Sequence, residues 1–250
     1  MEFLNLVRRR NDIPMHYLKQ LLVQILLLMP LMFSAQITPG VYKATEILEN
    51  GKRNYLLMVT ESYMIHTVYD SNPAHFVSTM GGFFKVELDS LKIRLEFNSD
   101  FEKTGEKEYR ATVGYAEGEM IFNGNSDRPY TRQPMLEQPL DGQWLFATRG
   151  PDTGQERRGD DQPRKTLKFL KDGYFQWIAY NTETMDFRGT GGGRYAADQG
   201  TYMEVIQFFS RDDSRVGAEL SFQFERKGDD WHHKGNNSKG EPMYEIWVIR

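Results

Sequence analysis

The chain has 250 residues, of which 39% are hydrophobic and 13% aromatic, and it contains no cysteine. This composition is typical of a protein with a sizeable core, and it excludes a disordered chain, disulfide bonds and a lipid-modified cysteine. The formal net charge is −4, with no stripe of Lys and Arg interleaved with aromatics, so we expect no nucleic-acid binding.

The first 35 residues have the pattern of a secretory signal peptide. A basic stretch at residues 8–10, followed by Lys19, precedes the apolar run 21–33 and the small residues Ser34 and Ala35. We expect cleavage after Ala35 and export to the periplasm or out of the cell, with translation starting at Met1 or at Met15. The run is too short for a good membrane span, and an uncleaved anchor is the alternative. Removal of residues 1–35 leaves 27 basic and 33 acidic residues, a net charge of −6.

One sequence unit occurs twice in the rest of the chain. Residues 63–70 correspond to residues 174–181 at a spacing of 111, and the same spacing aligns residues 81–84 with 192–195 and residues 96–99 with 207–210. The two starts, residues 40–42 and 142–144, are 102 apart, because a polar loop at residues 149–165 lengthens the second copy. We therefore predict two domains, residues 36–133 and 138–250, with a proline-containing linker. A single larger domain with chance similarity is the alternative.

Both copies are predicted to be strands. Leu91, Ile93 and Leu95 alternate with charged residues, as do Leu220 and Phe222 with polar ones, which is the two-residue period of a sheet. Turn signals recur every eight to twelve residues, as at 49–51, 171–173, 227–230 and 236–240. We predict an all-β fold of two tandem small antiparallel β-barrels, because closure removes exposed strand edges. The short turn at residues 212–215 is the one helical candidate.

The second copy resembles a known group of barrels. Its Gly142-Gln143-Trp144, a Gly-x-Trp before a meander of strands, resembles the lipocalin and wider calycin group. Residues 174–180, 191–193, 208–212, 231–232 and 240–247 resemble an uncharacterised family of secreted bacterial lipocalin-like domains. The resemblance covers residues 138–250 and reaches 36–133 only through the repeat, as a degenerate copy. It implies that Trp144 closes the barrel floor and that Arg250 packs across it.

Aromatic and polar residues of the second copy are candidates for binding a ligand. Glu245 shares a strand face with Trp247, so it is expected to bind a ligand or act as an acid or base; the alternatives are an outward position or an ion pair with Arg194. We expect no metal site, because His232 and His233 are adjacent and point to opposite faces. The alternative is that the aromatics merely fill the core. The candidate ligand-binding residues are Tyr174, Trp177, Tyr180, Glu204, Phe209, His232, Glu245 and Trp247.

Familiar enzyme motifs are missing from the sequence. The glycine run at residues 189–193 lacks a following Lys-Ser/Thr, so a β-bulge or tight bend is expected there and at Gly81-Gly82. No Gly-x-Ser-x-Gly elbow occurs. We expect an exported, non-enzymatic protein that holds a small apolar or amphipathic ligand, without a cofactor and without a membrane span after signal removal. The alternatives are an envelope interaction module with filled barrels, docking on a protein or glycan, and a calycin-like enzyme that uses Glu245 or His232.

Overall fold

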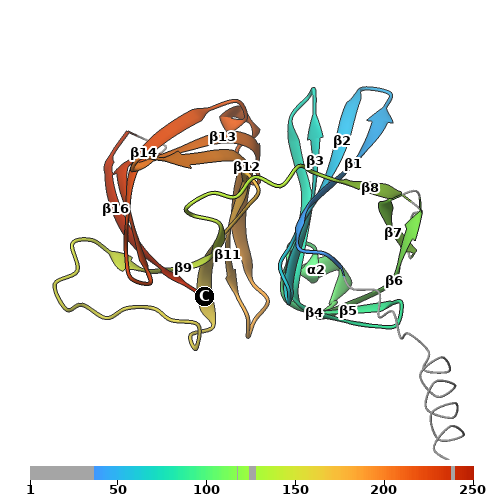
Figure 1. Cartoon of the computed structure of the whole chain (residues 1–250), viewed down its shortest axis with the longest axis horizontal. Coiled ribbons are helices and arrows are strands. Elements are labelled where there is room, and N and C mark those ends of the chain that lie inside the picture. The colour runs from blue at the N-terminus through green and yellow to red at the C-terminus, as the bar shows by residue number, and fades with distance from the viewer. Residues whose placement is uncertain (1–36, 117, 124–127, 238–239) are drawn as a thin grey trace, which may run out of the picture. The chain divides into compact units, whose positions relative to one another are not determined.

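The computed structural model describes residues 37–116, 118–123, 128–237 and 240–250, and the predicted signal peptide, residues 1–35, lies outside the described residues. The described residues belong to one compact unit that contains two closed, eight-stranded antiparallel β-barrels (Figure 1). The prediction of an all-β fold with two tandem barrels is confirmed. In the described ranges, no helix has the length and apolar character needed to cross a membrane.

The first barrel is a meander in which each strand pairs with the next and β8 returns to β1. Its strands are β1 (Gly40–Leu48), β2 (Gly51–Val59), β3 (Tyr63–Ser71), β4 (His75–Glu87), β5 (Ser90–Asn98), β6 (Glu108–Ala116), β7 (Glu119–Asn123) and β8 (Pro129–Arg132). One helical turn, α2 (Phe101–Thr104), lies between β5 and β6 and ends at Gly105, which has a φ of 66°. The sequence did not predict α2, because four residues are too few to show a helical period.

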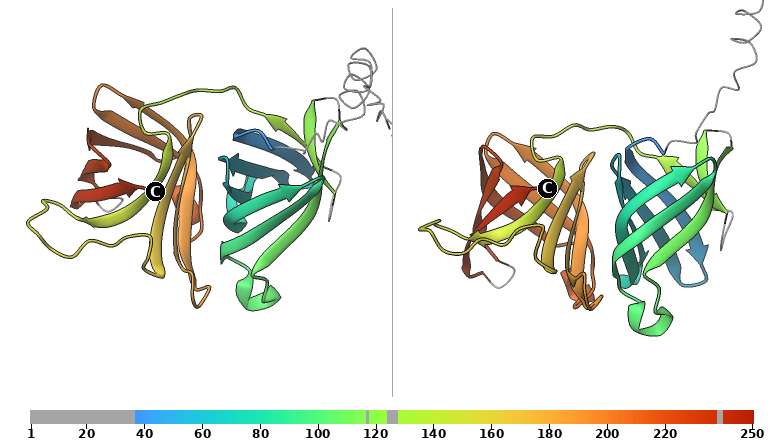
Figure 2. Two further views of the ribbon diagram at one scale, coloured as in Figure 1. Left: turned by 60° about the horizontal axis from the view of Figure 1, so that its bottom comes forward. Right: turned by 90° about the horizontal axis from the view of Figure 1, so that it is seen from below.

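The second barrel has the same topology, with β16 returning to β9. Its strands are β9 (Gly142–Arg149), β10 (Arg164–Lys171), β11 (Tyr174–Asn181), β12 (Phe187–Asp198), β13 (Thr201–Phe209), β14 (Glu219–Lys227), β15 (Asp230–Asn236) and β16 (Pro242–Ile249). A short 3-10 helix, η1 (Asp213–Arg215), occupies the turn that was the helical candidate. Figure 2 shows how the strands of each barrel tilt around it, and how the long loop between β9 and β10 extends from the second barrel.

The internal repeat is visible in matching irregularities of the two barrels. A β-bulge separates Gly81 from Gly82 in β4, and the equivalent bulge separates Gly192 from Gly193 in β12. A side chain at Gly82 would place its Cβ 2.0 Å from the carbonyl oxygen of Arg94, so the backbones approach too closely there for any other residue. The bulge or bend predicted at both glycine pairs is therefore present.

The barrels contact each other through the outer faces of equivalent strands. The ring of Tyr69 lies 4.9 Å from that of Phe208, and the equivalent residues with the copies exchanged, Tyr180 and Phe97, lie 5.1 Å apart. These four side chains belong to one buried apolar cluster that draws on both barrels. Because the contacts are reciprocal, the interface has the approximate two-fold character of a symmetric dimer interface.

A buried polar group lies within this interface. The side-chain amide of Gln176 donates to the hydroxyls of Thr79, at 3.1 Å, and Thr190, at 3.0 Å, and its oxygen accepts from Thr67 at 2.7 Å. Thr79 and Thr190 are themselves equivalent, at the repeat spacing of 111. The fully buried amide of Gln176 is therefore satisfied by residues of both barrels, which favours one docking register.

Candidate functional site

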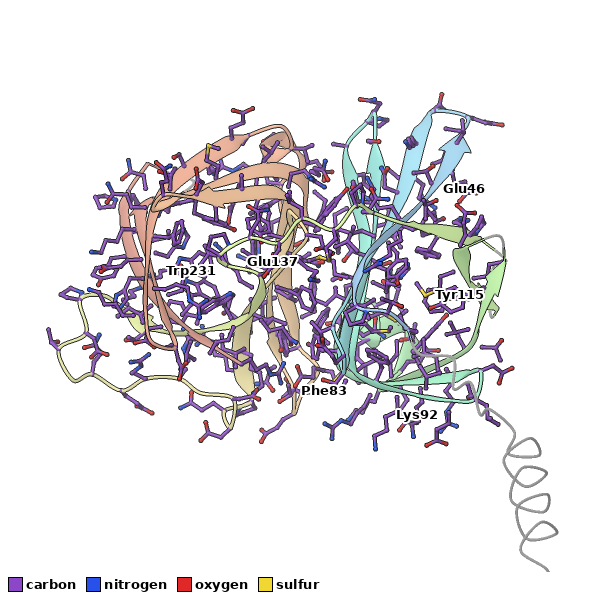
Figure 3. All side chains as sticks on the ribbon, viewed as in Figure 1. Glu46, Phe83, Lys92, Tyr115, Glu137 and Trp231 are labelled. Carbon is purple, nitrogen blue, oxygen red and sulfur yellow. The ribbon has the colours of Figure 1, made fainter. Side chains whose placement is uncertain are left out.

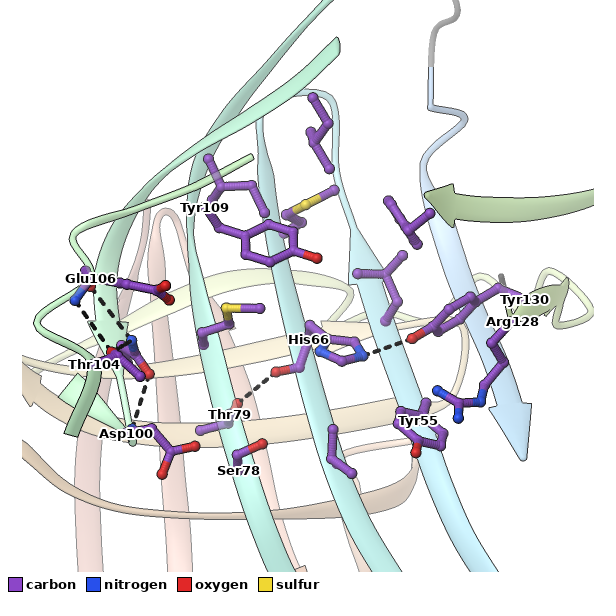
Figure 4. Close-up of a pocket in the computed structure, with 18 residues that line it drawn as sticks. Tyr55, His66, Ser78, Thr79, Asp100, Thr104, Glu106, Tyr109, Arg128 and Tyr130 are labelled. Atoms are coloured by element: carbon purple, nitrogen blue, oxygen red, sulfur yellow. Dashed lines mark hydrogen bonds between the residues drawn. The ribbon is translucent and has the colours of Figure 1, made fainter. Parts of the chain in front are cut away.

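The first barrel contains a cavity of about 440 Å³, within the range of small-molecule binding sites (Figure 4). Apolar side chains from β2, β3 and β5 form much of its wall, namely Leu57, Met64, Leu91 and Ile93. Polar side chains gather toward the end of the barrel that carries α2. Thr104 and Glu106 are exposed at that end, which identifies it as the mouth.

His66 and Tyr130 form a polar pair within the cavity. The Nε2 atom of His66, on β3, lies 2.8 Å from the hydroxyl of Tyr130, on β8, so one group donates a hydrogen bond to the other. Burial lowers the pKa of His66 to about 4, and the positive charge of Arg128 adds to this effect. The imidazole is therefore neutral near pH 7 and offers the cavity a hydrogen-bonding group without charge.

Hydrogen bonds hold the mouth in shape around Asn98. Its side-chain amide donates to the Thr104 hydroxyl at 3.2 Å, and its oxygen accepts from the backbone amide of Asp100 at 2.9 Å. Thr104 also accepts from the backbone amide of Glu106 at 3.2 Å. These bonds hold the backbone of Asp100 and Glu106, two acidic residues that border the cavity on the segment that contains α2.

The cationic side chain in the lining is already engaged. An Nη atom of Arg128 lies 2.8 Å from the carboxylate of Glu46, and the guanidinium lies 3.8 Å from the centre of the Tyr55 ring. The hydroxyl of Tyr55 donates to the same carboxylate at 2.7 Å. Arg128 is thus held against the wall by a charge pair and a cation–π contact, and its charge is compensated by Glu46.

Several inward side chains of the first barrel that border the cavity are smaller than their counterparts in the second barrel. At four cavity-lining positions, the residue 111 positions later is a larger aromatic one: Phe175 for Met64, Trp177 for His66, Tyr202 for Leu91 and Phe209 for Asn98. The sequence carried this signal in the comparison of the two copies. The smaller residues of the first copy were not chosen as candidates, because the lipocalin-like motifs lie in the second copy.

Aromatic side chains occupy the interior of the second barrel. Trp144, Phe175, Tyr202 and Trp231 are fully buried there, and Figure 3 shows Trp231 inside the ring of strands. The long side chain of Lys168 also points inward. Its Nζ atom lies 2.8 Å from the Glu204 carboxylate and between 5.0 and 5.9 Å from the centres of four aromatic rings: those of Tyr202, Phe222, Trp231 and Trp247.

His233, considered from the sequence only as a metal ligand, is a further inward residue of this barrel. Its ring packs 4.4 Å from Phe222 and 5.1 Å from Trp231, measured between ring centres. Neither ring nitrogen has a hydrogen-bond partner, and the nearest carboxylate oxygen, of Glu245, is 3.8 Å away. Burial lowers the pKa of His233 well below its usual value, and the charge of Lys168 acts in the same direction.

Five of the eight predicted ligand-binding residues lie on the inner face of the second barrel, and none of the eight lines the cavity of the first. The rings of Trp177 and Phe209 meet at 5.6 Å, and the indole of Trp247 donates to the Glu245 carboxylate at 3.2 Å. Glu204 is paired with Lys168. The five inward residues therefore contact one another or other inward side chains of the second barrel, whereas the cavity described above lies in the first barrel.

The other three predicted residues lie on outer faces. Tyr174 and Tyr180 are buried in the apolar cluster between the barrels. The Nδ1 atom of His232 lies 2.8 Å from the hydroxyl of Tyr244, away from the barrel interior. Arg194, the alternative partner of Glu245, lies 3.8 Å from the centre of the Tyr174 ring instead. These three side chains therefore point away from the barrel interior, which corrects the prediction that they line a cavity there.

Arg250 does not pack across Trp144. The cation over that indole is Arg226, at 5.1 Å from the ring centre, while the indole nitrogen donates to the Leu140 carbonyl at 2.9 Å. Arg250 instead makes two hydrogen bonds to Glu96 of the first barrel, at 2.8 and 2.7 Å. Because Ile249 packs into the core of the second barrel, strand alternation turns Arg250 to the outside.

No protein-family model and no curated protein matches the chain. The cavity of the first barrel is the feature of the described structure that points to a function.

Proposed function

We propose that the chain is an exported, non-enzymatic, lipocalin-like protein that holds a small amphipathic molecule inside its first barrel. The observation that carries the proposal is the cavity of about 440 Å³ within a closed barrel, apolar along much of its wall and polar at its mouth. Export is supported by the signal-peptide pattern of residues 1–35. The lipocalin-like assignment is supported by the Gly-x-Trp of the second copy and the eight-stranded meander of both barrels.

The lining gives the ligand an orientation. Its apolar body packs against Leu57, Met64, Leu91 and Ile93, where each buried methylene contributes about 0.8 kcal/mol. Its polar end lies toward the mouth. A hydroxyl or carbonyl along its length can hydrogen-bond to the neutral His66, which keeps accessible surface although it lies deep within the barrel.

The test is native mass spectrometry of residues 36–250, purified from the native host. We expect a bound small molecule at one per chain. His66→Trp and Leu91→Tyr, made separately, install the residues of the second barrel at equivalent positions and should reduce the bound fraction by at least tenfold. Ile47→Trp is the matched control, because Ile47 is exposed and absent from the lining, so added bulk there should leave binding unchanged.

Two outcomes contradict the proposal. One is a variant of the cavity that keeps its circular dichroism spectrum and its bound molecule at the native stoichiometry, which would place the ligand elsewhere. The other is a native chain that carries no molecule and takes up none of a panel of alkyl amines, alcohols and carboxylates. Using two single variants guards against the failure of one to fold.

A further inference from the structure

The charges of the cavity lining are unevenly compensated. Asp100 and Glu106 place two carboxylates at the mouth, and Arg128 is the one cationic side chain among the described lining residues. Arg128 is paired with Glu46 at 2.8 Å. The contact of Asp100 with Lys103, at 3.2 Å, involves a lysine side chain that is 82% exposed, so solvent screens it strongly. Among the described residues that line the cavity, negative charge is therefore in excess.

The aromatic residues of the lining add to this preference. Tyr55, Tyr109, Phe122 and Tyr130 all border the cavity. The face of an aromatic ring carries partial negative charge and attracts a cation, whereas it repels an anion. The carboxylate of Glu106 lies close enough to Tyr109 to contribute to raising the pKa of its hydroxyl, after the larger effect of burial, so ring and carboxylate share one region of the site.

We propose that the molecule bound in the first barrel carries a cationic nitrogen, as a primary amine or a quaternary ammonium group, beside Asp100 and Glu106 at the mouth. This inference rests on the proposed binding function and specifies its ligand class. The apolar body of the amine extends toward Leu57 and Ile93. On binding, the amine loses contacts with water and gains contacts with carboxylate oxygens and aromatic ring faces. Both kinds of contact favour a positive charge.

An anionic ligand, such as a fatty acid, fits this lining poorly. Its carboxylate would face two like charges at the mouth, and the charge of Arg128 is already balanced by Glu46. The neutral imidazole of His66 supplies a hydrogen bond but no positive charge. The negative formal charge of the chain, −4, also favours the approach of a cation.

The experiment compares decylamine, decanol and decanoate, which share one alkyl chain, by isothermal titration calorimetry with residues 36–250 at pH 7 and low salt. We expect the amine to bind more tightly than the carboxylate by about tenfold, with the alcohol between them. Asp100→Asn and Glu106→Gln should each weaken decylamine by about twofold to fivefold and leave decanol unchanged. Glu102→Gln is the matched control, because Glu102 lies on α2 but does not line the cavity.

The outcomes separate this inference from the binding function. Decanoate binding as tightly as decylamine, or an amine affinity that neither Asp100→Asn nor Glu106→Gln changes, would overturn the cationic ligand and leave the cavity as a binding site. Failure of all three probes to bind would overturn both proposals. A loss of amine affinity in Glu102→Gln equal to that in Glu106→Gln would show a general charge effect and would also overturn the site assigned here.

Discussion

Lys168 and Glu204 form an ion pair inside the second barrel, and removing the lysine should destabilise the fold strongly. Their charged atoms are 2.8 Å apart, and the two side chains are 7% and 6% exposed. Lys168→Met would leave the Glu204 carboxylate with one remaining donor in the described structure, the hydroxyl of Tyr202 at 2.8 Å. An unpaired buried charge of this kind costs about 3–5 kcal/mol of unfolding free energy.

The reciprocal change should cost less. Glu204→Gln keeps an oxygen that accepts from Tyr202, and the Lys168 ammonium keeps the faces of its four surrounding rings, which contribute about 2 kcal/mol when water is excluded. We expect a loss of about 1–3 kcal/mol. The double variant removes both charges and should lie within about 1 kcal/mol of the native chain, so the two changes should be coupled by about 3 kcal/mol or more.

The assay is urea unfolding followed by tryptophan fluorescence. All four tryptophans, at positions 144, 177, 231 and 247, belong to the second barrel, so the signal reports on the barrel that is changed. Far-UV circular dichroism shows whether the first barrel unfolds in the same transition. A coupling energy below about 1 kcal/mol, or a loss below about 1 kcal/mol for Lys168→Met alone, would refute a buried, mutually dependent pair.

Two further predictions concern the first barrel. Since burial holds the pKa of His66 at about 4, against 6.5 in the unfolded chain, the unfolded state binds a proton first as the pH falls. The unfolding free energy should therefore decrease between pH 6.5 and 4, and His66→Gln should flatten this part of its pH profile; an unchanged slope would contradict the neutral imidazole. Gly82→Ala should cost about 3 kcal/mol or more, because its Cβ would meet the Arg94 carbonyl at 2.0 Å, whereas Gly114→Ala, with open space around it, should stay within about 1 kcal/mol. Equal melting temperatures for the two alanine variants would show that the bulge does not require glycine.

The repeat and the strand pattern were predictable from the sequence because both are periodic along the chain. A spacing of 111 aligned Gly81-Gly82 with Gly192-Gly193, and both pairs mark a bulge in equivalent strands. The alternation around Leu91 and Ile93 predicted a strand with one buried face, and these residues do point inward. Period and spacing depend on neighbours in sequence, so one chain was enough to read them.

Which face of a strand points inward was not predictable where both faces are buried. The strands β3 and β11 carry apolar residues on their outer faces as well, because the barrels pack against each other there. Tyr174 and Tyr180 were therefore assigned to a cavity when they belong to the interface. Alternation identifies residues that share a face, but it cannot distinguish inside from outside when neither face meets water.

By itself the sequence determined two similar β units and the positions of their strands and bulges. Only the tertiary structure decided that the first barrel encloses a cavity, since the sequence shows smaller residues at four positions but not that they share one interior. The free volume depends on inward side chains brought together from strands far apart in sequence, as His66 and Leu91 are in the first barrel and Trp177 and Tyr202 in the second. The volume left free inside a barrel depends on which side chains the closed sheet encloses together. The order of residues along the chain does not give that set, because packing is a property of the enclosed space.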